Sequence, residues 1–86
     1  MLKREIKIQN ESGLHARPAS LFVKEASKYN SEIKVIKGEK EYNAKSIMGL
    51  LSMGASKNQM IAIQAQGADE ELAVYSLIEL VSNLAD

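Results

Sequence analysis

The chain has no cysteine, no tryptophan, a single phenylalanine and no surplus of charge of either sign. Without cysteine it can form neither a disulfide framework nor a thiolate metal site, and a reducing compartment is permitted. Lysine plus arginine and aspartate plus glutamate both number 11, so the net charge is zero with histidine neutral. Because no basic field draws the chain to nucleic acid, we expect small charged molecules or proteins as partners.

Long apolar runs are also missing. Charges interrupt the N-terminal stretch MLKREIKIQN every few residues, so it resembles neither a secretory signal nor a transmembrane span. We therefore expect a soluble, cytoplasmic protein without membrane insertion. With 86 residues, the chain is long enough for one modest core and too short for separate cofactor and substrate domains. This length predicts a single domain over residues 1–86 and, by default, a monomer.

Hydrophobic periodicity predicts four strands and three helices in the order β-α-β-β-α-β-α. Alternating apolar residues indicate strands over residues 2–8, over MIAIQAQG, and in EIKVIKGEKEY as a hairpin that turns at Gly38. SIMGLLSMG predicts a two-turn helix between an N-cap serine and Gly54. ADEELAVYSLIELVSNLAD predicts the third helix, whose acidic start suits the positive end of a helix dipole. The first helix is predicted over residues 17–28 by a stripe at three- and four-residue steps, Ala19, Phe22, Val23, Ala26 and Tyr29.

The element order predicts an α+β fold. Two crossover helices and one hairpin suggest a mixed or mainly antiparallel four-stranded sheet with the helices on one face, an open sandwich. The other face of the sheet must then be mostly in water. Lys3, Glu5 and Lys7 alternate as that geometry requires, whereas Ile36 on the wet side does not fit the pattern.

The segment GLHARPAS, residues 13–20, contains the only histidine and the only proline of the chain. Pro18 lacks an N–H and has φ fixed near the helical value, so it fits in the first helical turn and places His15 at the helix entrance. The backbone N–H groups of Ala16 and Arg17 favour an anion there, and the Arg17 guanidinium matches phosphate oxygens. A neutral imidazole can accept a phosphoryl group on one ring nitrogen. Together these groups describe a phosphoryl acceptor.

A simpler interpretation of His15 competes with this one. A lone histidine near a helix N-terminus is more often an ordinary exposed or capping residue, and spacing alone favours that interpretation. A metal site is weaker still, because the chain offers no second histidine and no cysteine. The chain also lacks the glycine-rich motif of nucleotide-binding loops, so we expect neither a metal nor a cofactor.

A family resemblance favours the phosphoryl-acceptor interpretation of His15 over that of an ordinary exposed histidine. GLHARPAS resembles the active-site signature of HPr, the histidine-containing phosphocarrier family of the bacterial phosphoenolpyruvate:sugar phosphotransferase system, and KSIMGLLSMG resembles its second hallmark segment. Length and element order agree over essentially the whole chain. The resemblance implies an open-faced β-sandwich in which enzyme I phosphorylates His15 on Nδ1 and the group passes to IIA domains of sugar permeases. It also implies that Arg17 pairs with the phosphoryl oxygens, and that the chain is a carrier rather than a turnover enzyme.

Ser46 has two interpretations. From the sequence alone it is the N-cap of the short helix. The run NAKSIMGLLSMG resembles HPr of low-GC Gram-positive bacteria, which implies that HPr kinase/phosphorylase phosphorylates Ser46 with ATP. In that family the modified form is a poor substrate for enzyme I and binds catabolite control protein A. A phosphate on Ser46 would meet free helix N–H groups and the adjacent Lys45.

The short helix carries more apolar residues than one face can bury. Core packing must take at least half of Ile47, Met48, Leu51 and Met53, and the remainder is expected to stay exposed. Methionine and branched aliphatic side chains form an adaptable surface. We therefore expect Ile47, Met48 and Leu51 to contact enzyme I and IIA domains.

Two other classes of protein fit the sequence less well. A purely regulatory HPr-like catabolite-repression protein would act through Ser46, but it has glutamine in place of the active histidine, and His15 argues against it. A small RNA-binding module is disfavoured by the zero net charge and by the lack of a basic or aromatic strand pattern.

Overall fold

The computed structural model describes residues 1–85 and contains the predicted elements in the predicted order. The strands are β1 (Leu2–Lys7), β2 (Glu32–Lys37), β3 (Lys40–Asn43) and β4 (Met60–Gln66). The helices are α1 (Ala16–Ala26), α2 (Ile47–Met53) and α3 (Glu70–Ser82). Because α1 ends earlier than predicted, Tyr29 lies in the turn beyond the helix, where it still packs half-buried against the core.

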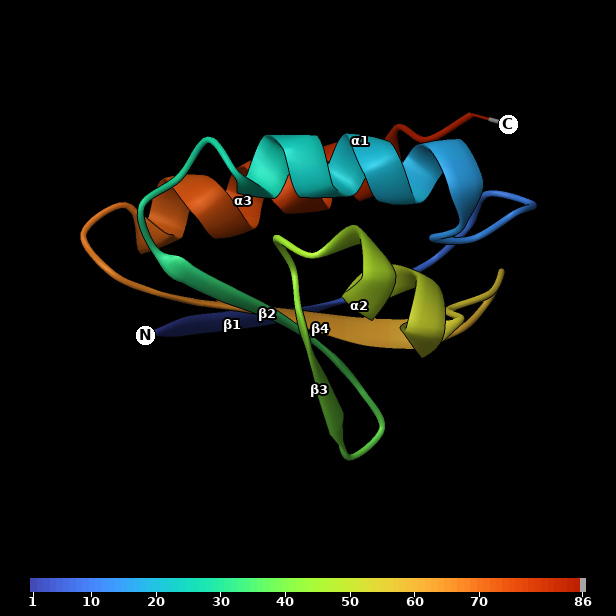
Figure 1. The fold of residues 1–86 in the computed structure, drawn as a ribbon, viewed down its shortest axis with the longest axis horizontal. Coiled ribbons are helices and arrows are strands. Elements are labelled where there is room, and N and C mark those ends of the chain that lie inside the picture. Colours follow the sequence, from blue (N-terminus) through green and yellow to red (C-terminus); the bar gives the residue numbers. More distant parts are fainter. Residues whose placement is uncertain (86) are drawn as a thin grey trace.

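All four strands form one sheet in the order β1-β4-β2-β3, and every neighbouring pair is antiparallel. The fold is therefore α+β, as predicted, and the sheet is wholly antiparallel rather than mixed. The register places Ile6 opposite Ile61 and Val35 opposite Ile63. Figure 1 shows α1 and α3 side by side and running in opposite directions above this sheet, with α2 covering the same face.

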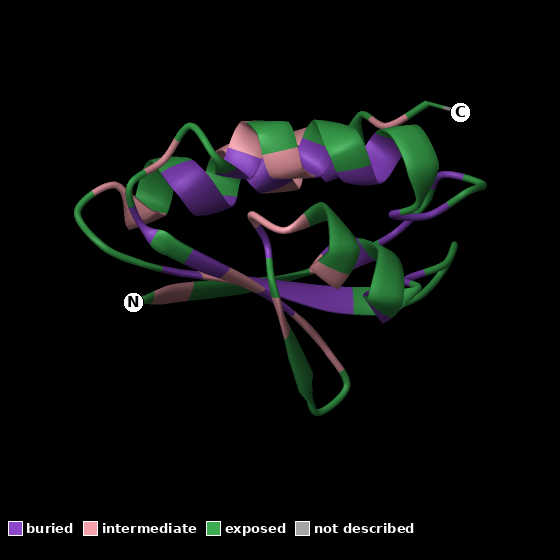
Figure 2. Cartoon of the chain, viewed as in Figure 1, coloured by how far each residue is buried: buried purple, intermediate pink, exposed green. Residues whose placement is uncertain are grey.

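The core lies between the sheet and the helices. Figure 2 shows buried residues on α1 and α3 and along β4, one of the two strands with neighbours on both sides. Phe22 of α1 and Leu77 of α3 are fully buried in this core. On the outer face Ile36 is half-buried between Ala62 and Glu41, and this small apolar pair with Ala62 explains why an isoleucine is tolerated there. Within residues 1–85, no helix combines the length and the apolar character needed to cross a membrane.

Candidate functional site

The loop that leads to His15 is fastened to the segment that follows α2. Gly13 has a positive φ of 66°, and a Cβ there would overlap the carbonyl oxygen of Ala55. The Leu14 N–H donates to that same oxygen (3.0 Å), and the Leu14 side chain is fully buried. Only glycine combines this backbone conformation with so close an approach. The residues that precede His15 are thus fixed by packing and by hydrogen bonding.

His15 is the N-cap residue of α1, with an extended backbone (φ −137°) and an exposed ring. Its imidazole makes no capping hydrogen bond to the helix, so the helix does not use the ring as a cap. Ala16 follows in the left-handed region (φ 50°), which is unfavourable for a residue with a Cβ. Pro18 lies buried in the first turn, as predicted. His15 is therefore an exposed residue at a sharp bend at the start of the helix.

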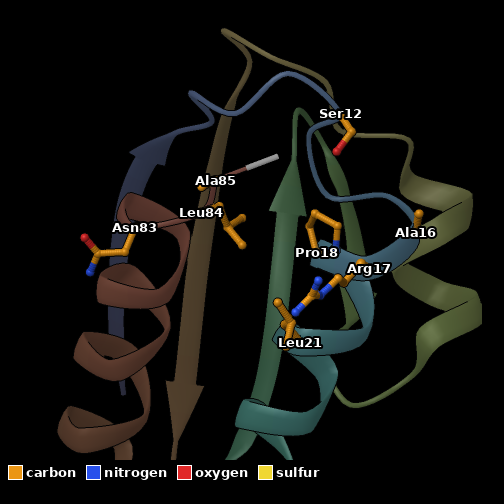
Figure 3. Close-up of a pocket in the computed structure, with 8 residues that line it drawn as sticks. All are labelled: Ser12, Ala16, Arg17, Pro18, Leu21, Asn83, Leu84 and Ala85. Atoms are coloured by element: carbon orange, nitrogen blue, oxygen red, sulfur yellow. The ribbon is translucent and has the colours of Figure 1, made fainter.

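Arg17 is exposed and makes no ion pair or side-chain hydrogen bond with another residue of the described chain, so its donors are available to an anion. It lines a surface hollow of about 430 Å³ between the start of α1 and the residues that follow α3. Figure 3 shows Arg17, Pro18 and Leu21 on one side of this hollow and Leu84 facing them from the other. Ala16 and Arg17, the two helix-end residues predicted to receive an anion, both line it.

Ser46 caps α2 as predicted. Its Oγ accepts a hydrogen bond from the Gly49 N–H (3.1 Å), and Gly54 ends the helix in the left-handed conformation (φ 63°). The adjacent Lys45 donates from its Nζ to the carbonyl oxygen of Tyr29 (2.6 Å). Carbonyls beyond a helix C-terminus lack helical partners and attract a cation, so this lysine is held there while Ser46 is unmodified.

The apolar residues of α2 divide between the core and the surface. Met53 is buried, whereas 77% of Met48 and 37% each of Ile47 and Leu51 are exposed. Leu21 of α1 is exposed to a similar degree and was missed by the sequence analysis. Its exposure could have been predicted, because Leu21 lies outside the helical stripe that Ala19 and Phe22 define. α1 and α2 pack against each other, but Leu21 lies in the hollow between α1 and the residues after α3, so its exposure belongs to that hollow.

The carboxylates with shifted pKa values lie elsewhere in the molecule. Hydrogen bonds from the Ser31 hydroxyl and from the Asn30 and Ser31 backbone N–H groups (2.8 and 3.0 Å) hold the pKa of Asp69 below its ordinary value. Asp69 is the N-cap residue of α3, and Glu70 and Glu71 lie in its first turn, as the predicted acidic start requires, although the Asp69 side chain makes no capping bond to the helix. In α1, the hydrogen bond from Lys28 lowers the pKa of Glu25, assisted by Ser76 and Tyr29.

Comparison with known proteins yields a consistent result. Residues 2–83 match the family profile described as the PTS HPr component phosphorylation site. The phosphocarrier protein HPr of Buchnera aphidicola is 46% identical over 84 residues, which cover 98% of this chain and 99% of that protein. The HPr-like protein Crh of Halalkalibacterium halodurans is 41% identical, with 94% and 96% covered.

Solved structures agree with the sequence matches. A crystal structure of HPr from Thermoanaerobacter tengcongensis superimposes with a TM-score of 0.93 at 49% identity, over 95% of this chain and 92% of that one. A crystal structure of an HPr dimer from the same organism gives a TM-score of 0.76 at 51% identity, with 90% and 88% covered.

Proposed function

The chain belongs to the HPr family of the phosphotransferase system, and from that premise we propose that His15 accepts a phosphoryl group from phosphorylated enzyme I and passes it to IIA domains of sugar permeases. The observation that carries the proposal is the exposed ring of His15 at the entrance of α1, next to an arginine whose donors are not engaged within residues 1–85.

The chemistry needs little from the protein. The lone pair of one imidazole nitrogen attacks phosphorus, the bond from phosphorus to the donor group of enzyme I breaks, and the donor leaves with that electron pair. The other ring nitrogen keeps its proton. Arg17 offsets the charge on the phosphoryl oxygens, and positioning within the protein complex does most of the rest. The same step in reverse, toward a IIA nucleophile, empties the carrier.

Intact-mass spectrometry tests the carrier role. The protein is incubated with phosphoenolpyruvate, magnesium and enzyme I, then measured at neutral pH and after mild acid. We expect one phosphoryl adduct that acid removes and that His15→Ala does not form, since a phosphoryl group on nitrogen is acid-labile and one on a serine oxygen is not. No adduct on a folded wild-type protein with active enzyme I would contradict the proposal.

We further propose Ser46 as a regulatory site for HPr kinase/phosphorylase, with the modified form binding catabolite control protein A. Ser46 is half-buried at the start of α2, and a phosphate on its Oγ would add roughly −1.5 to −2 charge beside the exposed Ile47 and Met48. Incubation with the kinase and ATP should give an acid-stable adduct in the wild type and none in Ser46→Ala. An acid-stable adduct without any adduct on His15 would favour the purely regulatory role instead.

The exposed residues Ile47, Met48 and Leu51 are proposed to contact enzyme I and IIA domains. A carboxylate placed in an apolar contact weakens that contact. Met48→Glu combined with Leu51→Glu should therefore raise the KM for enzyme I about tenfold or more. Leu72→Glu is the control, because Leu72 is also an exposed apolar residue but lies on α3. Equal kinetics for the double variant and the control would contradict the contact. The cytoplasmic location and the monomeric state remain predictions, which cell fractionation and light scattering can check.

A further inference from the structure

Two polar residues have buried side chains within the described chain, Asn10 with 6% of its surface exposed and Ser31 with 1%. Ser31 is explained by its hydrogen bond to Asp69. Asn10 lies five residues before His15, and the phosphoryl chemistry described above gives it no role. Burying a carboxamide is costly unless it is hydrogen-bonded, so the partners of Asn10 are informative.

Asn10 holds the turn that leads to His15. Its Nδ2 donates to the carbonyl oxygen of Gly13 (2.9 Å), and its own backbone oxygen accepts from the Gly13 N–H (3.2 Å). The peptide group between Gly13 and Leu14 is therefore bound on both sides. Asn10 binds its carbonyl, and Ala55 accepts its N–H.

A peptide group held at both its polar atoms cannot rotate without breaking one of the two bonds. The next residue, Leu14, is anchored by its buried side chain, so the orientation of the chain that enters His15 depends on this peptide group. We infer that Asn10 is a positioning residue for His15: its carboxamide fixes the Gly13–Leu14 peptide and thereby the direction in which the imidazole meets the phosphoryl donor. This inference rests on the proposed carrier function.

The test compares Asn10→Asp and Asn10→Ala with Ser31→Ala. Aspartate keeps the shape of asparagine but has no donor for the Gly13 carbonyl at neutral pH, and alanine removes the group altogether. Ser31→Ala is the matched control, because it also removes a buried side-chain hydrogen bond and lies at the other end of the helical layer. Urea unfolding establishes the folded fraction of each variant, and the kinetics are measured on samples that are folded.

We expect both Asn10 variants to lower kcat for phosphorylation by enzyme I about tenfold, because small displacements of a nucleophile cost large factors in rate. KM should change by less than about twofold, because the exposed α2 residues are untouched. The ring signals of His15 in NMR spectra should shift in both variants and stay unchanged in Ser31→Ala. If either Asn10 variant folds poorly, the other carries the comparison.

Two outcomes overturn the inference. One is a kcat within about twofold of wild type for the folded Asn10 variants, and the other is a loss of kcat in Ser31→Ala that matches theirs, which would indicate a general effect of lowered stability. If the wild type itself accepts no phosphoryl group, the carrier function fails separately. The NMR signals of His15 still decide whether Asn10 orients the ring, and unchanged signals would reject that role.

Discussion

α1 and α3 begin at opposite ends of the helical layer, and their first residues are used differently (Figure 1). At the start of α3, the Asp69 carboxylate receives hydrogen bonds from Asn30 and Ser31, which tie the turn before β2 to the start of the helix. At the start of α1, His15 makes no capping bond and Arg17 has no ion-pair partner within residues 1–85.

The comparison shows what side chains without partners in the described chain provide at the start of a helix. A carboxylate whose oxygens are saturated by donors holds two segments together and has little capacity left for a ligand. Exposed donors and an exposed nucleophile stabilise nothing within the chain, but they are available to a transferred group. We therefore expect substitutions near Asp69 to lower the free energy of unfolding, and substitutions near His15 to lower the rate of phosphoryl transfer.

The largest expected effect is that of Arg17→Ala on the rate of phosphoryl transfer. Removing one charge-assisted donor from a developing phosphoryl charge should slow transfer about a hundredfold. Stability should change by less than about 0.5 kcal/mol, because Arg17 is exposed and makes no contact that holds the fold. Rapid-quench kinetics with enzyme I and urea unfolding measure the two quantities.

Arg4→Ala is the control for that experiment. Arg4 is an exposed arginine on β1, where it donates to the Lys3 carbonyl oxygen (2.9 Å) and to the Tyr75 hydroxyl (3.4 Å). Its loss should leave the transfer rate unchanged. Transfer that slows equally in both variants would mean that general positive charge, rather than pairing by Arg17, assists the reaction.

The second prediction concerns the Asp69 end. Ser31→Ala should lower the free energy of unfolding by about 1–2 kcal/mol, because Asp69 loses its hydroxyl donor and the site is buried. The rate of transfer to and from His15 should be unchanged. If Ser31→Ala keeps full stability, or if it loses transfer activity while folded, the two helix starts do not differ in the way proposed.

The third and smaller effect is the pH dependence of the same contact. The folded pKa of Asp69 lies below its ordinary value of 3.8, chiefly because of the Ser31 hydroxyl. The ionised carboxylate therefore adds stability that is fully present above the ordinary value and is lost as the pH falls through the lower folded value. Wild type should lose more stability than Asp69→Asn between about pH 5 and about pH 2 in urea titrations.

Glu71→Gln is the control for the acid titration, since Glu71 is an exposed carboxylate in the first turn of α3. Glu71 takes no part in the hydrogen bonds that Asp69 receives from Asn30 and Ser31, so this variant should keep the acid-dependent contribution of Asp69. Parallel profiles for wild type and Asp69→Asn would show that the carboxylate of Asp69 contributes nothing specific.

Most of the fold was predictable because each element has a strong local signal. Ser46 and Gly54 mark the two ends of α2 in the sequence, and the structure shows the predicted cap and the predicted left-handed end. Pro18 likewise places the start of α1. Alternation identified all four strands, although it left open whether the sheet was mixed or antiparallel, since strand direction depends on how distant segments pair.

The supports of the site were less predictable, because they join residues that are far apart in the sequence. The contact between Gly13 and Ala55 gives no periodic signal, and neither does the hydrogen bond of Lys45 to Tyr29. Asn10 lies between the strand predicted over residues 2–8 and the helix predicted over residues 17–28, in a connecting segment of the kind where asparagine is common. Only the folded structure shows it buried.

The smallest expected effect is that of Ala16→Gly. The left-handed backbone of Ala16 (φ 50°) costs an L-residue roughly 1–2 kcal/mol. Glycine avoids most of that cost but loses more conformational entropy on folding. The variant should therefore gain about 0.5 kcal/mol in the free energy of unfolding, measured by urea titration. Ala19→Gly is the control, because Ala19 lies inside α1, where glycine should cost about 1 kcal/mol or more. If both variants lose stability, Ala16 is helical in solution and the bend beside His15 is not built into the fold. A gain confined to Ala16→Gly would show that the end carrying His15 keeps an unfavourable conformation, and that the chain sacrifices a little stability there to present the ring.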